Sequence, residues 1–94
     1  MPVGLLLIYL HLPDCNSLKD KRSAIKPILA KLHRDYNLSV AELALQDAWR
    51  EAELGCAMVS NEAAHIQTTL QQVTRAIETH WPNVELVDQH IEIY

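Results

Sequence analysis

Apolar residues follow two different periods in the first half of the chain. Val3 to His11 is an almost continuous apolar run that ends at Pro13, which is typical of a strand buried on both faces. Apolar residues then recur at helical spacing and predict a helix over residues 18–36, with Asn16 or Ser17 as its N-cap. That apolar stripe consists of Leu18, Ile25, Ile28, Leu29, Leu32 and Tyr36. Pro27 falls inside the helix, where we expect a local bend.

The second half contains three shorter patterns and one more helix. Residues 39–46 alternate and predict a half-buried strand. Residues 50–59 predict a third strand, in which Gly55 indicates a bulge or a close backbone approach. Ser60 or Asn61 is expected to cap a second helix that ends at Trp81, before Pro82. Residues 84–93 form the last predicted strand.

This order of elements is βαββαβ, and it predicts an α+β fold of the ferredoxin-like type as a single domain over residues 1–94. Right-handed crossovers place the first and third strands in the centre of a four-stranded antiparallel sheet and the fourth and second strands at its edges. Both helices then cover one face of the sheet. The other face has no cover within the chain.

Composition and charge narrow the class of protein. The chain has 94 residues and a net charge of −4, yet six of its eight basic residues lie between Lys19 and Arg34. The apolar run at the N-terminus is far shorter than the ~20 residues that a membrane span needs, so we expect no membrane association. Cys15 and Cys56 are too few for a disulfide framework. A cytoplasmic location is expected, with both thiols reduced.

The basic helix suggests contacts with a phosphate backbone. Lys19, Lys21, Arg22 and Lys26 are the candidate nucleic-acid contacts, and ribosome or RNA association is the function that they favour. A merely solvated helix face is the alternative. The strands lack the aromatic residues that stack bases in RNA-recognition sheets, and we expect no recognition of a DNA sequence.

The uncovered sheet face suggests a second kind of binding. Leu5, Leu7 and Tyr9 alternate with Leu6, Ile8 and Leu10 in the first strand, and only one of these sets can meet the helices. Monomers rarely expose a large apolar patch, so we expect a homodimer through this face. The candidate interface residues are Leu5, Leu7, Tyr9 and Trp49. The alternative to dimerisation is that side chains of the edge strands fold over the patch. The alternative to an RNA-binding function is a homodimeric module that holds a ligand or a protein on this face.

No set of residues indicates catalysis, a metal or a cofactor. The five histidines lack the spacings of metal ligands. Cys15 precedes a helix N-terminus, which can lower a thiol pKa, but the loop thiol is better explained as tolerated than as a nucleophile. The loop after the first strand has neither the Arg nor the Gly of an acylphosphatase-like anion site. We therefore expect a binding protein that is not an enzyme.

Several segments together resemble the YlxP-like family of small bacterial proteins of unknown function. These segments are Leu10-His11-Leu12-Pro13, the run from Ser17 to Arg22, the turn from Gln46 to Trp49, Leu54-Gly55 and Val59-Ser60-Asn61. The resemblance covers nearly the whole chain and implies a ferredoxin-like fold. Members are often encoded among genes for translation initiation and ribosome maturation, which implies a role near the ribosome. The resemblance implies no catalytic residues.

Overall fold

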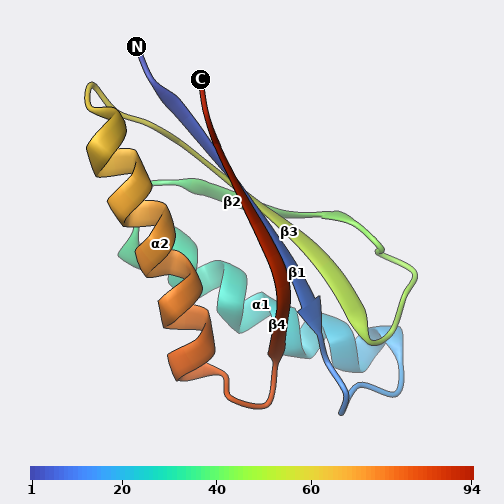
Figure 1. Cartoon of the computed structure of the whole chain (residues 1–94). Helices are drawn as coiled ribbons and strands as arrows, with labels where there is room; N and C mark the ends of the chain where they lie inside the picture. The colour runs from blue at the N-terminus through green and yellow to red at the C-terminus, as the bar shows by residue number, and fades with distance from the viewer.

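The computed structural model describes residues 1–94 and has the six expected elements in the expected order. These are β1 (Val3–His11), α1 (Leu18–Asp35), β2 (Ser39–Ala44), β3 (Glu51–Val59), α2 (Ala63–His80) and β4 (Glu85–Ile93). The four strands form one antiparallel sheet in the order β2-β3-β1-β4. Both helices lie on one side of it (Figure 1). The predicted ferredoxin-like α+β architecture is confirmed.

The two ends of the chain lie side by side (Figure 1). The amide of Val3 donates to the Tyr94 carbonyl at 3.0 Å, and the amide of Tyr94 donates back to Val3 at 2.8 Å. This pairing extends the ladder between β1 and β4 to the last residue of the chain. Neither helix combines the length and the apolar character that crossing a membrane requires.

The core lies between the helices and one face of the sheet. Leu6, Ile8 and Leu10 of β1 are buried there, together with Ala52, Leu54, Cys56 and Met58 of β3. They pack on the buried stripes of the helices, which include Ile25, Ile28 and Leu32 of α1 and Ile66, Leu70, Val73 and Ile77 of α2. Because neighbouring residues of a strand point to opposite faces, this burial leaves Leu5, Leu7 and Tyr9 on the open face.

Helix α1 begins as the sequence indicates. The Ser17 hydroxyl accepts a hydrogen bond from the Asp20 amide at 3.0 Å, and the Asp20 carboxylate accepts one from the Asn16 amide. This reciprocal arrangement is close to a capping box. The helix continues through Pro27 and ends at Asp35, as a single element.

Two local expectations were wrong. The N-cap of α2 is Glu62, which makes no side-chain cap, while the Ser60 hydroxyl accepts from the Glu62 amide. Strand β2 stops at Ala44, two residues early, because Leu45 has φ 64° and leaves the extended conformation. A leucine in this region of φ is unfavourable unless surrounding contacts hold it.

Candidate functional site

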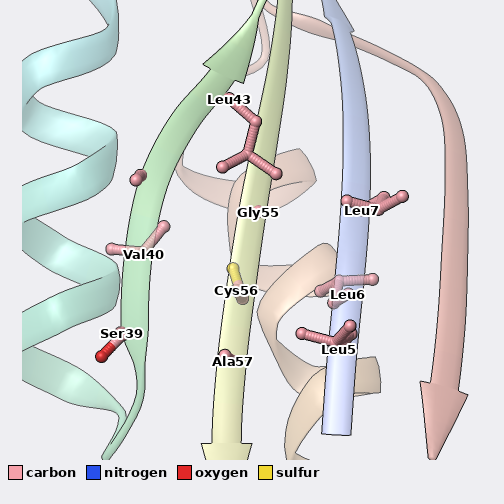
Figure 2. A pocket seen from close by; sticks show the side chains of 10 residues that line it. Leu5, Leu6, Leu7, Ser39, Val40, Leu43, Gly55, Cys56 and Ala57 are labelled. Carbon is pink, nitrogen blue, oxygen red and sulfur yellow. The ribbon is translucent and has the colours of Figure 1, made fainter.

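The open face of the sheet has an apolar hollow of about 280 Å³. Its lining on this face comes from alternate residues of three strands: Leu5 and Leu7 of β1, Ser39, Ala41 and Leu43 of β2, and Gly55 and Ala57 of β3. Figure 2 shows the three strands side by side, with Leu43 over β3 and Leu5 and Leu7 on the neighbouring strand β1. Leu5 is 37% exposed and Leu43 is 51% exposed. The hollow is therefore a solvent-facing apolar surface.

Gly55 determines the shape of this hollow. A Cβ at position 55 would overlap the Cδ1 and Cγ atoms of Leu43, so only glycine lets that side chain lie across β3 (Figure 2). The register between β2 and β3 shifts between Glu42 and Ala44, which makes Leu43 the irregular residue. The sequence pointed to a bulge or a close backbone approach at Gly55; the group that approaches it is the Leu43 side chain, and the bulge lies opposite, in β2.

Acidic residues occupy the same face. Paired residues of an antiparallel sheet share a face, and β1 pairs Leu5 with Glu92, Tyr9 with Asp88 and Glu53, and His11 with Glu51 and Glu85. Five carboxylates therefore accompany the apolar hollow. The four strands contain no Lys or Arg.

The carboxylates are concentrated at one end of the face. Leu5 and Leu7 lie at the apolar end, and Tyr9 and His11 lie further along β1 among Glu51, Glu53, Glu85 and Asp88. A second hollow, of about 340 Å³, lies at this acidic end, where Leu45 and Val87 contribute apolar side chains. The Glu53 carboxylate raises the pKa of the Tyr9 phenol, first as a hydrogen-bond acceptor, with burial and the charges of Glu53 and Asp88 adding to the effect.

The structure separates the four predicted interface residues. Leu5 and Leu7 line the apolar hollow, and Tyr9 lies next to it on the same strand. Trp49 is 53% exposed, but it lies in the turn between β2 and β3 and lines a different hollow with Asp47 and Arg50. Sequence reasoning missed Ala41 and Leu43 as lining residues. The alternation of residues 39–46 carried that signal, but it did not show which side of the strand faces the helices.

The opposite side of the molecule carries unpaired cations. Lys19, Arg22 and Lys26 are exposed on α1, and none of them forms an ion pair. At 100° per residue the three fall within an arc of about 60°. Lys31 and Arg34 instead share Asp35, at 2.6 Å and 3.1 Å. One strip of α1 thus presents three cations to solvent.

Lys21 is a correction to the predicted nucleic-acid contacts. Its side chain is 3% exposed, and its Nζ lies 2.8 Å from Glu42 Oε2 and donates to the Leu45 carbonyl. Glu42 Oε2 is buried and receives no aligned hydrogen bond, so its contact with Lys21 is one of charge. The helical position of Lys21 faces β2, which the sequence pattern alone did not reveal. Lys21 holds the Leu45 turn and is not available to a phosphate.

The two layers therefore differ in charge. The two helices contain seven basic and three acidic side chains, a net charge of +4. The four strands contain six carboxylates and no Lys or Arg, a net charge of −6. Such a distribution orients charged partners as they approach, and it favours anions on the helix side and cations on the sheet side.

Neither cysteine has the surroundings of a nucleophile. Burial, followed by the charges of Asp20 and Asp14, raises the pKa of Cys15, whereas an activated thiol needs a lowered pKa. Burial raises the pKa of Cys56 to about 12. No three His, Cys, Asp or Glu side chains lie where they could hold a metal ion.

The fold and this site define a small ferredoxin-like α+β domain with an uncovered sheet face. Over residues 3–91 the chain matches the family described as "Protein of unknown function (DUF503)", and it belongs to that family. It is 35% identical, over 72 residues, to the uncharacterized protein YlxP of Bacillus subtilis (strain 168), a match that covers 77% of each chain. The expected resemblance to the YlxP-like family is confirmed.

Two solved structures are similar in fold. A de novo designed protein called Foldit4 has a TM-score of 0.56 and 16% identity, with 100% of this chain and 97% of that one covered. A second de novo design, LFR1 1, with a ferredoxin fold, has a TM-score of 0.53 and 11% identity, over 100% of this chain and 83% of the other. At these identities the likeness shows the fold alone.

Proposed function

We propose that the protein is a non-catalytic RNA-binding protein that contacts the phosphate backbone with the exposed strip of α1. The observation that carries this proposal is the set of three unpaired cations, Lys19, Arg22 and Lys26, on one exposed arc of a helix. An unpaired cation releases condensed counterions when it meets a phosphate, whereas a cation already neutralised within the protein contributes less.

The separation of charge supports the same proposal. A protein with a net charge of −4 is repelled by RNA as a whole, so RNA must approach the side where cations gather. The helix layer is that side. Lys19 and Lys26 lie two helical turns apart, roughly 10 Å along the axis, which allows contacts with successive phosphates. The resemblance to the YlxP-like family makes ribosomal RNA the first RNA to test.

The test is fluorescence anisotropy with a labelled single-stranded segment of ribosomal RNA, over a salt series from low to physiological concentration. We expect the triple variant Lys19→Gln, Arg22→Gln, Lys26→Gln to bind at least tenfold more weakly. The slope of log K against log salt should fall in magnitude by about 2, at roughly 0.7 for each lost single-strand contact.

The chain provides a matched control on the same helix. Lys31→Gln with Arg34→Gln removes two cations that Asp35 already neutralises. This variant should keep most of the affinity and most of the salt slope. If both variants lose affinity equally, or if neither does, the strip of α1 is not the RNA contact.

The homodimer predicted from the sequence stays a prediction. The apolar side chains Leu5, Leu7 and Leu43 on the open face support it. The carboxylates on the open face argue that a partner other than a second copy binds there.

A further inference from the structure

We propose that the open face of the sheet is a docking site for a basic segment of another protein that carries apolar anchor residues. This site is separate from the RNA contact, since α1 and α2 cover the opposite face of the sheet (Figure 1). Two features of the face identify the occupant: where its apolar residues lie and where its charges lie.

The apolar end of the face requires an apolar partner group. Leu5, Leu7 and Leu43 surround the hollow, and Leu43 covers Gly55 (Figure 2). The hollow holds about 280 Å³, enough for one or two aliphatic side chains. Covering such a surface is favourable at roughly 25 cal/mol for each Å² of apolar area removed from water.

The acidic end requires positive charge. Glu51, Glu53, Glu85 and Asp88 face outward beside Tyr9 and His11, and no Lys or Arg is present in any strand to neutralise them. A partner without cations would have to bury or approach these carboxylates at a cost. A partner with cations gains both attraction and a faster encounter.

A second copy of this chain fits the face poorly. Face-to-face pairing about an axis along the strands would place the acidic end of one copy on the acidic end of the other. Pairing about an axis across the strands would place each acidic end on an apolar end. Sliding the copies until only the apolar ends overlap leaves an area on the order of 300 Å² per copy, from strand spacings. A stable interface buries about 800 Å² per partner.

The spacing of the face predicts a pattern for the segment. Gly55, Glu53 and Glu51 follow one another on the same face of β3, two residues apart. An extended chain that runs along β3 advances at the same rate, about 3.4 Å per residue, and also presents every second side chain. Apolar residues over Ala57 and over Leu43, which covers Gly55, should therefore be followed by basic residues two and four positions beyond, over Glu53 and Glu51.

The probe is a labelled synthetic peptide with the sequence Leu-Ser-Leu-Ser-Lys-Ser-Lys, mixed with the full-length protein. We expect binding in anisotropy measurements at low salt, and none for the same peptide with Glu in place of Lys. The quadruple variant Glu51→Gln, Glu53→Gln, Glu85→Gln, Asp88→Asn should bind the peptide at least tenfold more weakly.

The matched control changes the net charge by the same amount elsewhere. Asp14→Asn, Asp47→Asn, Glu62→Gln and Glu78→Gln remove four exposed carboxylates that lie outside the strands. This variant should retain affinity for the peptide within about threefold. Equal losses in the two quadruple variants would show attraction to net charge alone and overturn the proposal.

Two further measurements keep the proposal testable if a variant folds poorly. In amide NMR spectra of the unmodified protein, the peptide should shift Leu5, Leu7 and Gly55 and leave α1 and α2 unchanged; shifts confined to the helices would overturn the proposal. Sedimentation without peptide should give a monomer. A dimer that dissociates in the variant Leu5→Ser, Leu43→Ser would instead identify a second copy as the occupant.

The variant of Lys19, Arg22 and Lys26 that loses RNA binding should still bind the peptide. The proposal on RNA and the proposal on the open face can therefore fail separately.

Discussion

The two faces of the sheet are built from the same strands and differ in what covers them. On the covered face Leu6, Ile8 and Leu10 of β1 are at most 2% exposed. On the open face Leu5 is 37% exposed, and Leu7 and Tyr9 are half-buried. The covered face is mainly apolar and contains the Lys21–Glu42 ion pair, while the open face combines an apolar hollow with five carboxylates. One face supplies stability, and the other is available for a partner.

The two glycines show the same difference. Gly4 lies under α2, where a Cβ would overlap Cγ2 of the fully buried Ile66. Gly55 lies under Leu43, a side chain that is half exposed and able to turn toward solvent. The first glycine is needed for packing of the core. The second is needed only for the shape of the surface.

The largest effect is expected from truncation of a covered side chain. Ile8→Ala should lower the free energy of unfolding by about 2–5 kcal/mol, through lost burial and a residual cavity. Leu43→Ala on the open face should cost less than about 1 kcal/mol. Urea unfolding followed by circular dichroism measures both. Similar losses would mean that the open face is buried in solution.

A smaller loss of stability is expected from breaking the ion pair between Lys21 of α1 and Glu42 of β2. Lys21→Met leaves Glu42 without its cation and frees the Leu45 turn, at a cost of about 1–3 kcal/mol. Adding Glu42→Leu should restore much of the loss, because a buried pair can be replaced by apolar groups. Lys19→Met, on the solvent side of the same helix, is the control. An unchanged midpoint for Lys21→Met would contradict a structural role.

Substitution of the glycines should separate stability from surface shape. Gly4→Ala forces β1 and α2 apart and should cost about 1–3 kcal/mol, as other overpacked cores do. Gly55→Ala should change the unfolding midpoint little, since Leu43 can swing outward. It should nevertheless weaken peptide binding, because the hollow changes shape. Equal destabilisation by the two substitutions would show that Leu43 is held as firmly as Ile66.

Ionisation of Cys56 is expected to have no effect on stability at neutral pH, and its effect appears only at high pH. Its pKa is raised to about 12 in the folded protein, while an unfolded thiol ionises near 9. Between these values the folded state binds more protons, so the free energy of unfolding falls as pH rises, by about 1.4 kcal/mol per pH unit. Below pH 9 the Cys56 thiol is protonated in both the folded and the unfolded state, so its full contribution to stability is present. The difference between the unmodified protein and Cys56→Ala should show this slope, and a flat difference would contradict the raised pKa.

The sequence predicted the elements well because local patterns determine them. The apolar run of β1, the helical stripe from Ile25 to Leu32 and the Ser17 cap all depend on neighbours within a few residues. The errors also have local causes. Leu45 breaks β2 in a backbone conformation that leucine rarely adopts, and Glu62 begins α2 without a capping side chain. Neither event has a sequence signal.

The candidate sites were predictable only in part. Lys19, Arg22 and Lys26 are exposed as expected, but Lys21 lies among them in the sequence and apart from them in space. Its burial depends on β2, which contributes Glu42 and the Leu45 carbonyl from more than twenty residues away. Trp49 was expected at the sheet interface, and the turn that holds it places it at another hollow.

The sequence by itself determined the order of elements, the βαββαβ fold and the polarised charge of the chain, because these follow from periodicity and composition. Only the tertiary structure decided which of the two alternating sets of β1 side chains faces water and which cation is buried. It also decided that five carboxylates share a face with the apolar hollow. Those properties depend on strand register and on the side of the sheet that the helices cover. Register joins residues far apart in the chain, and no local pattern specifies it.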